Sequence, residues 1–74
     1  MPEEVEVIQK VIFTTTWKNG SKPDYVFLPS GRKVMVTYMK NGKIMFDDGN
    51  YGNFFWELDN KETGEKRIRV EMER

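Results

Sequence analysis

The sequence predicts an all-β fold, a small antiparallel meander of five to six strands. Short runs of β-branched and aromatic residues alternate with turn signals built from glycine, proline and asparagine. No helical stretch is long enough to connect two parallel strands. The side chains expected to face the core are too numerous for one flat sheet, so the sheet should curl into a small barrel of the SH3-like or OB-like kind.

A chain of 74 residues is expected to form a single domain, which we place over 1–74. Such a short chain buries only about 60% of its unfolded surface, so its stability depends on a well-filled core. Cysteine is absent, which excludes disulfide bonds and thiolate metal sites. Ten aromatic residues must therefore supply much of the apolar burial.

Twelve basic residues balance twelve acidic ones, which gives a formal net charge of zero. This balance weighs against two classes of very small protein, the basic nucleic-acid binder and the acidic mimic of DNA. A net charge of zero also favours self-association.

The N-terminus, Met-Pro-Glu-Glu, is acidic and leads into no uninterrupted apolar span. We therefore expect neither a secretory signal nor a transmembrane helix, and no membrane partner. Together with the absence of cysteine, this predicts an intracellular, cytoplasmic protein.

The first segment, Val5–Trp17, is rich in β-branched residues and predicts a long strand with a bulge or bend near Gln9-Lys10. Ile8 and Ile12 fall on one side of this strand. Alternation places five residues on the other side: Val5, Val7, Val11, Phe13 and Trp17. The alternative is a short helix from Pro2, because proline followed by two glutamates is a helix-start signal.

A loop over Lys18–Asp24 leads into a short strand, Tyr25–Leu28. The strand ends at Pro29-Ser30-Gly31, where proline suits the first corner of a turn and glycine its exit. Whether Tyr25 and Phe27 face the core depends on the length of this turn, and the sequence leaves both orientations open.

The segment Val34–Phe46 predicts a hairpin around Asn41-Gly42. A two-residue loop would pair Met39 with Ile44 and mix apolar and polar side chains on both faces. A three-residue loop, Lys40-Asn41-Gly42 with Gly42 left-handed, separates them better, so we predict it. The pairs Tyr38–Ile44 and Val36–Phe46 then share the inner face with Val34. The outer face carries Met35, Thr37, Met39, Lys43 and Met45.

A second hairpin is predicted from Phe54–Asp59 and Lys66–Met72, closed by a three-residue loop, Glu62-Thr63-Gly64, with Gly64 left-handed. In this register Trp56 pairs with Val70. The inner face holds Phe54, Trp56, Leu58, Ile68, Val70 and Met72. On the outer face two ion pairs are expected, Glu57–Arg69 and Asp59–Arg67.

The residue types weigh against catalysis. The chain has neither histidine nor cysteine, which removes the commonest general base and the best nucleophile. Asp47 and Asp48 are adjacent, so at a strand end they point to opposite faces and do not form an acid–base pair across a cleft. We expect a protein that is not an enzyme and that binds no cofactor.

The run Asp48–Asn53 is similar to the start of a calcium loop, with oxygen ligands between glycines. The order differs, because such a loop has Asp or Asn where Gly52 stands and glycine where Asn53 stands. Turn formation explains the same residues, and we predict no metal site.

One candidate function is the binding of single-stranded nucleic acid. Small barrels bind single strands by stacking bases on aromatic side chains beside basic ones. The aromatic candidates are Tyr25, Phe27 and Tyr51, and the basic candidates are Arg32, Lys33, Lys40 and Lys43. Two arguments oppose this function. Interleaved acids, Asp24, Asp47 and Asp48, would repel phosphate. The candidates also have another explanation, in which the lysines keep the sheet edges soluble and the aromatic residues belong to the core.

The preferred function is a non-catalytic binding module, an inhibitor, adaptor or assembly component, that contacts a protein partner or its own copy. The predicted register directs three methionines outward, Met35, Met39 and Met45, and methionine-rich surfaces repack easily around partners. Phe55 joins this candidate surface, and the Tyr51 loop is the next choice. The alternative is that residues 1–12 cover the methionines as a second core layer.

Overall fold

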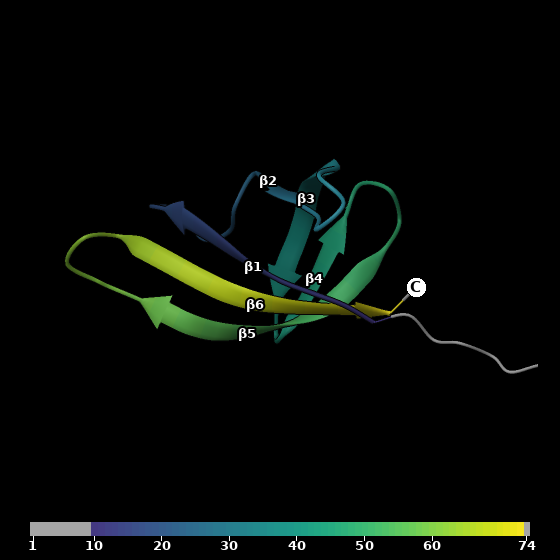
Figure 1. The fold of residues 1–74 in the computed structure, drawn as a ribbon. Coiled ribbons are helices and arrows are strands. Elements are labelled where there is room, and N and C mark those ends of the chain that lie inside the picture. Colours follow the sequence, from purple (N-terminus) through teal and green to yellow (C-terminus); the bar gives the residue numbers. More distant parts are fainter. Residues whose placement is uncertain (1–9, 74) are drawn as a thin grey trace, which may run out of the picture.

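The computed structural model describes residues 10–73, and these form an all-β fold of six antiparallel strands with no helix (Figure 1). The strands are β1 (Lys10–Lys18), β2 (Tyr25–Phe27), β3 (Lys33–Lys40), β4 (Lys43–Phe46), β5 (Tyr51–Asp59) and β6 (Glu65–Glu73). The predicted all-β meander is therefore confirmed. The expectations for a strand that begins at Val5 and for a helix at Pro2 lie outside the described residues.

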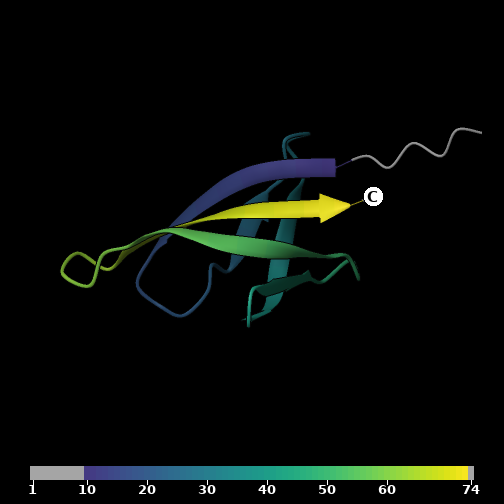
Figure 2. The ribbon, with the colours of Figure 1, turned by 90° about the horizontal axis from the view of Figure 1, so that it is seen from below.

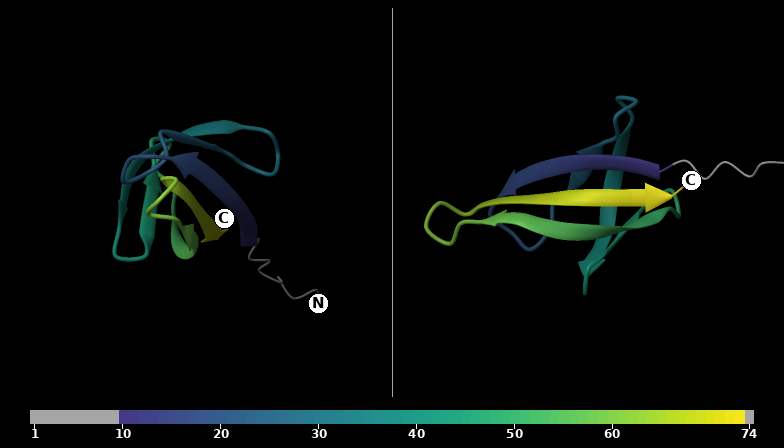
Figure 3. Two further views of the ribbon diagram at one scale, coloured as in Figure 1. Left: turned by 90° about the vertical axis from the view of Figure 1, so that its left-hand side faces the viewer. Right: turned by 60° about the horizontal axis from the view of Figure 1, so that its bottom comes forward.

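The strands β2 to β6 follow one another across the sheet, and β1 lies beside β6, so the order is β1-β6-β5-β4-β3-β2. The sheet is curled, so that β3 crosses the long strands β1, β6 and β5 steeply (Figures 2 and 3). The result is a nearly closed barrel. Its two edge strands, β1 and β2, lie on either side of the remaining opening, which we call the seam.

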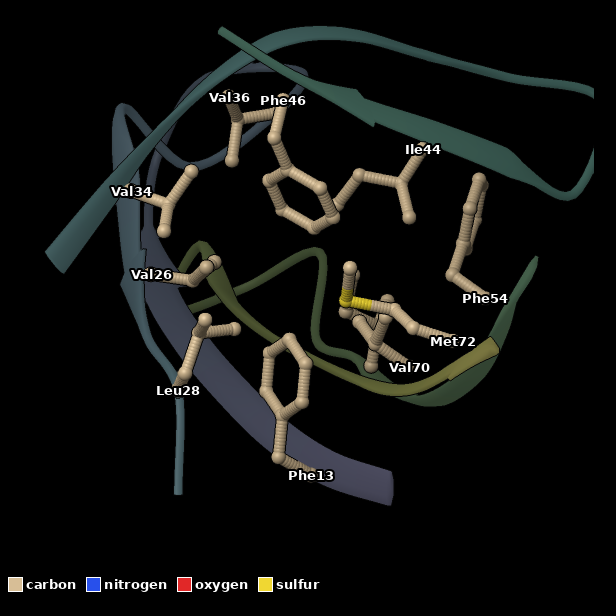
Figure 4. Packing of buried hydrophobic residues seen from close by; sticks show 11 residues of the cluster. Phe13, Val26, Leu28, Val34, Val36, Ile44, Phe46, Phe54, Val70 and Met72 are labelled. Atoms are coloured by element: carbon tan, nitrogen blue, oxygen red, sulfur yellow. The ribbon is translucent and has the colours of Figure 1, made fainter. Parts of the chain in front are cut away.

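In the described part of the chain, eleven buried apolar side chains from all six strands and the turn after β2 fill the barrel. They are Phe13, Val26, Leu28, Val34, Val36, Ile44, Phe46, Phe54, Ile68, Val70 and Met72. Figure 4 shows the side chains of β3 and β4 pointing toward those of β6 and β1. Within residues 10–73, no buried side-chain nitrogen or oxygen atom lacks a hydrogen-bond partner. Burial of apolar surface is thus the main stabilising term.

The central hairpin corrects the predicted register. Asn41 and Gly42 both have positive φ, 54° and 78°, and form a two-residue loop that pairs Lys40 with Lys43. Two left-handed residues suit the type I′ turn, whose twist matches that of the flanking strands. The predicted three-residue loop is wrong, although the left-handed Gly42 is confirmed.

A β-bulge at Thr37, between Val36 and Tyr38, changes which side chains face inward. Tyr38 pairs with Met45 rather than with Ile44, and it is 43% exposed. The prediction that Tyr38 faces the core is therefore wrong. Beyond the bulge the Val36–Phe46 pair forms as predicted. The extra residue in the bulge compensates for the shorter loop, so that Val36 again points into the barrel.

Three hydrogen bonds hold the backbone at this bulge. The Thr37 hydroxyl donates to the Met45 carbonyl at 3.3 Å. The Val36 N–H donates to the Asp24 carbonyl at 2.9 Å, and the Lys22 ammonium donates to the Val36 carbonyl at 2.9 Å. The loop before β2 thus supports the point where β3 bends.

The second hairpin also differs from its predicted pairing. Its loop spans residues 61–64, with the Asn60 N–H bonded to the Glu65 carbonyl at 2.9 Å, and Gly64 is left-handed as predicted, with φ 79°. Trp56 pairs with Ile68, so the predicted Trp56–Val70 pair is wrong. A second bulge, at Glu57, accounts for the remaining shift.

The bulge at Glu57 also changes the ion pairs. Glu57 lies 3.4 Å from Arg67, whereas Arg69 lies over the Phe55 ring, with its guanidinium carbon 4.8 Å from the ring centroid. Asp59 pairs with Lys61 at 3.0 Å. The predicted pairs Glu57–Arg69 and Asp59–Arg67 are therefore wrong.

On the inner face of this hairpin, the predicted side chains of Phe54, Ile68, Val70 and Met72 are buried. Trp56 lies on the same face of the sheet as its partner Ile68, but it is 49% exposed. Leu58 lies opposite Arg67, so it has left the core face on which it was predicted.

A three-residue loop with a left-handed glycine occurs elsewhere, at Asp47–Gly49. The Gly49 N–H donates to the Phe46 carbonyl at 3.1 Å, and the Phe46 N–H donates to the Asn50 carbonyl at 2.9 Å. The predicted turn after Leu28 is confirmed by a bond of 2.8 Å from the Gly31 N–H to the Leu28 carbonyl.

Candidate functional site

Six exposed apolar or aromatic side chains lie on the outer face of strands β2 to β5. They are Tyr25, Phe27, Met35, Tyr38, Met45 and Tyr51, and we call them the β2–β5 outer surface. Each is between 41% and 63% exposed. They are displayed because their neighbours in sequence on these strands, such as Val26, Val36 and Ile44, point into the barrel.

The strand register brings these side chains together in two rows. In the first row, Tyr38 of β3 lies directly opposite Met45 of β4, and Met45 in turn lies opposite Tyr51 of β5. Tyr25 lies opposite Met35 on β2 and β3, and its ring packs edge-on against Phe27 with centroids 5.5 Å apart. The open question about β2 is settled, since both of its aromatic residues point outward.

Two residues proposed from sequence for the contact surface lie apart from it. Met39 is half-buried and packs against the core, because the two-residue loop places it opposite Ile44. Phe55 is 44% exposed, but Asn53 separates it from Tyr51 along β5. The Asn53 side-chain oxygen accepts a hydrogen bond of 2.9 Å from the Lys43 ammonium. Arg69 lies over its ring.

The basic candidates lie at the ends of the β2–β5 outer surface. The Lys33 ammonium is 4.2 Å from the centroid of the Tyr25 ring. Arg32 pairs with Asp48 at 3.7 Å. Lys40 and Lys43 face each other at the hairpin tip, on the opposite end of β3. A positive charge therefore stands at each end, with the apolar side chains between.

Acidic residues lie beside the same surface. The Asp47 N–H donates to the Met35 carbonyl at 3.0 Å, which places this aspartate next to Met35. Asp24 directly precedes Tyr25 and is exposed. The acidic residues noted in the sequence are thus near the surface, and its rim is mixed in charge.

A groove of about 480 Å³ lies at the seam, lined by Thr14–Trp17 of β1 and by Pro23–Phe27. Trp17 is half-buried there, with its ring centroid 5.7 Å from that of Trp56 and its indole N–H bonded to the Gly20 carbonyl at 3.1 Å. Sequence reasoning did not identify this groove. The available signal was the uncharged run of β-branched residues in the first strand.

The residues weighed for metal binding form a turn. The Asp48 carboxylate accepts a bond of 2.9 Å from the Asn50 N–H and one of 3.0 Å from the Asn50 side-chain amide. Among residues 10–73, histidine, cysteine, aspartate and glutamate do not gather in groups of three that could hold a metal ion. In that same part of the chain, no helix combines the length and apolar character needed to cross a membrane.

No protein-family model matches this chain, and neither a curated protein nor a solved structure matches it. The β2–β5 outer surface contains six of the nine large exposed apolar side chains of the described residues.

Proposed function

We propose that this protein is a non-catalytic binding module of the cytoplasm, an inhibitor, adaptor or assembly component, that contacts a protein partner through its β2–β5 outer surface. The observation that supports the proposal is the register, which places exposed tyrosine and methionine side chains opposite one another over four strands. Contiguous apolar patches are seldom left bare on monomeric proteins, and tyrosine and methionine are enriched at interfaces.

The surface suits a partner in physical terms as well. The methionines are flexible and polarisable, so they adapt to the shape of an opposing surface. The tyrosines combine a large apolar ring with a hydroxyl that remains hydrogen-bonded when the ring is buried. The charges at the rim, such as Lys33 and Asp47, would orient the partner more than they would strengthen binding.

The proposal is tested by replacing Met35 and Met45 together by glutamate. Both side chains are more than 40% exposed, 44% and 41%, so the variant should keep its β-type circular dichroism spectrum and its melting temperature. Capture of the partner from source lysate by the tagged protein, or the dimer mass in sedimentation, should be lost.

Phe55→Glu is the matched control, because Phe55 is equally exposed, at 44%, and lies outside the surface. This variant should retain capture. Retained capture by the double methionine variant would place the contact elsewhere. Unfolding of the double variant would mean that the methionines are buried, and would contradict the proposal.

A second candidate function, binding of single-stranded nucleic acid, is favoured by one observation: Tyr25, Phe27 and Tyr51 are all exposed rather than in the core. Stacking of bases on such rings beside Lys33 is sequence-tolerant. A salt titration separates the two functions. Binding of a fluorescent oligothymidine should weaken steeply between 50 and 300 mM salt, on the order of tenfold or more, if phosphate contacts carry it. Nuclease-resistant, salt-insensitive capture supports the protein partner.

A further inference from the structure

The two edge strands at the seam differ in how far their backbones are protected. Strand β2 has three residues and lies between Pro23 and Pro29, which have no N–H to donate. Very short strands flanked by proline are a common way to block an edge. Strand β1 has nine residues and lies beside β6 (Figure 2). Among residues 10–73, β6 is its only hydrogen-bonded neighbour.

The register shows which backbone groups of β1 are directed to the seam. Every residue from Lys10 to Lys18 pairs with β6 without a shift. The Asn19 N–H donates to the Gly64 carbonyl at 3.0 Å, so the odd-numbered residues of β1 direct their N–H and C=O groups toward β6. The even-numbered residues, Ile12, Thr14 and Thr16 among them, direct these groups to the open edge.

The edge of β1 carries none of the usual protective features over Val11–Trp17. This run contains no charged residue, proline or glycine, and its pairing shows no bulge. Long, regular and uncharged edges template the addition of another strand. The groove of about 480 Å³ beside Thr14–Trp17 provides room next to it.

We propose that the β1 edge is a strand-addition site, distinct from the β2–β5 outer surface, that binds an extended segment of a partner protein antiparallel to β1. The side chains beside such a segment are Ile12, Thr14 and Thr16, all exposed, which favour β-branched partners. The bound segment is therefore an alternating stretch of valine, isoleucine or threonine.

Charge specifies one end of that segment. Lys10 pairs with Glu71 at 3.4 Å, whereas Lys18 has no ion pair within residues 10–73. In antiparallel addition the N-terminal end of the segment lies beside Lys18, so an acidic residue at that end complements it. A second copy of the chain fits less well, because two β1 strands paired about Thr14 would place Lys10 opposite Lys18 twice.

Amide hydrogen exchange followed by NMR tests this site. In the free protein, the amides of Ile12, Thr14 and Thr16 should exchange faster than those of Phe13 and Thr15, which are bonded to β6. The probe is a synthetic nine-residue peptide with an N-terminal glutamate followed by alternating valine and threonine. Its addition should slow exchange at the three even-numbered positions by about tenfold or more, since each becomes hydrogen-bonded.

Two control peptides test the mechanism. A peptide N-methylated at alternate residues, on the edge that faces β1, lacks the donors for the ladder and should give no protection. A peptide with lysine in place of glutamate should bind several-fold more weakly, because it places a positive charge beside Lys18. Equal binding of all three peptides would overturn the proposal.

A pair of proline variants gives an independent test. Thr14→Pro removes an N–H that faces the seam, so it should keep the fold and lose peptide binding. Thr15→Pro removes a bond to β6 and should destabilise the protein. If Thr14→Pro unfolds, the N-methylated peptide on the wild-type chain still decides the question.

Three results would refute the site: protection of the even-numbered amides in the dilute free protein, protection that rises with protein concentration together with a dimer mass, or no change at millimolar peptide. The Met35→Glu, Met45→Glu variant should bind the peptide normally. Failure of the strand-addition site and failure of the β2–β5 contact are therefore distinguishable.

Discussion

At the scale of single residues, two isoleucines test the assignment of inside and outside. Ile44 is 0% exposed and Ile12 is 51% exposed. Ile44→Ala should lower the free energy of unfolding by about 2–5 kcal/mol, and Ile44→Val by about 0.5–1.5 kcal/mol, because a cavity replaces buried methyl groups. Ile12→Ala should change it by no more than about 0.5 kcal/mol. Urea unfolding measures all three, and equal effects at the two positions would contradict the barrel.

Two glycines should resist substitution for different reasons. A Cβ on Gly52 would lie 2.7 Å from the Glu71 carbonyl oxygen and 2.8 Å from Met72 Cγ, so Gly52→Ala overpacks the sheet. Gly49 has open space around it but a φ of 88°. Gly49→Ala should therefore destabilise the protein only because alanine disfavours this backbone conformation. We expect costs of about 1–3 kcal/mol at Gly52 and about 1 kcal/mol at Gly49.

Replacement by asparagine separates the two causes. Asparagine tolerates the left-handed region, so Gly49→Asn should recover most of the stability lost in Gly49→Ala. Gly52→Asn should be worse than Gly52→Ala, because its side chain is larger. Thermal melts of the four variants check the order, and recovery at Gly52 would show that the close approach to β6 is absent.

At the scale of elements, the bulge in β3 makes a single-residue deletion tolerable. Without Thr37, the residues of β3 would alternate regularly and the pairs Val36–Phe46 and Met39–Ile44 would remain. The deletion should therefore keep the fold, with a modest loss of stability from the missing bond of the Thr37 hydroxyl to Met45. Cross-strand NOEs between Met39 and Ile44 provide the measurement.

Deletion of Met35 is the control. It would join the two buried valines Val34 and Val36 directly and expose one of them, so this variant should unfold. If both deletions behave alike, the strand tolerates any loss of one residue, and the bulge has no special role.

These bulges also explain what the sequence could and could not predict. Hydrophobic alternation and glycine positions correctly indicated an antiparallel meander of five to six strands, the inward Val34, Val36, Ile44 and Phe46, and the left-handed Gly42 and Gly64. Alternation assumes an uninterrupted period of two residues. A bulge breaks this period within a strand, and no residue type at Thr37 or Glu57 signals it.

The candidate surface was predictable to a similar degree. Met35 and Met45 were predicted to point outward, and they are exposed. This prediction did not depend on the length of the loop, because each methionine is next in sequence to residues that point inward, Val34 and Val36 or Ile44. Tyr38 and Met39 exchanged roles, because they lie between the bulge and the loop. The seam could not be predicted, since it depends on which distant strands become neighbours.

At the scale of the whole molecule, the two ends of the sheet-forming chain are adjacent. Lys10 lies opposite Glu73 in the β1–β6 pair. A circular permutant that joins residue 74 to residue 1 and opens the exposed loop between Lys61 and Glu62 should therefore fold to the same sheet. An NMR spectrum with nearly unchanged core resonances checks this.

Opening the chain between Ile44 and Met45 is the control for the permutant. Ile44 is fully buried at the centre of the sheet, so new charged termini there should prevent folding. A permutant opened at Lys61 that fails to fold would mean that β1 and β6 are not neighbours.

The pairing of β1 with β6 has a consequence for synthesis. Phe13 needs Val70 as its partner across the ladder, so the first described strand waits for the last one to leave the ribosome. Until then its β-branched segment has no hydrogen-bonded neighbour at all, and the barrel cannot grow strand by strand from the N-terminal side. During translation this segment is thus open to chaperones and to other nascent chains until β6 has been synthesised and can pair with it.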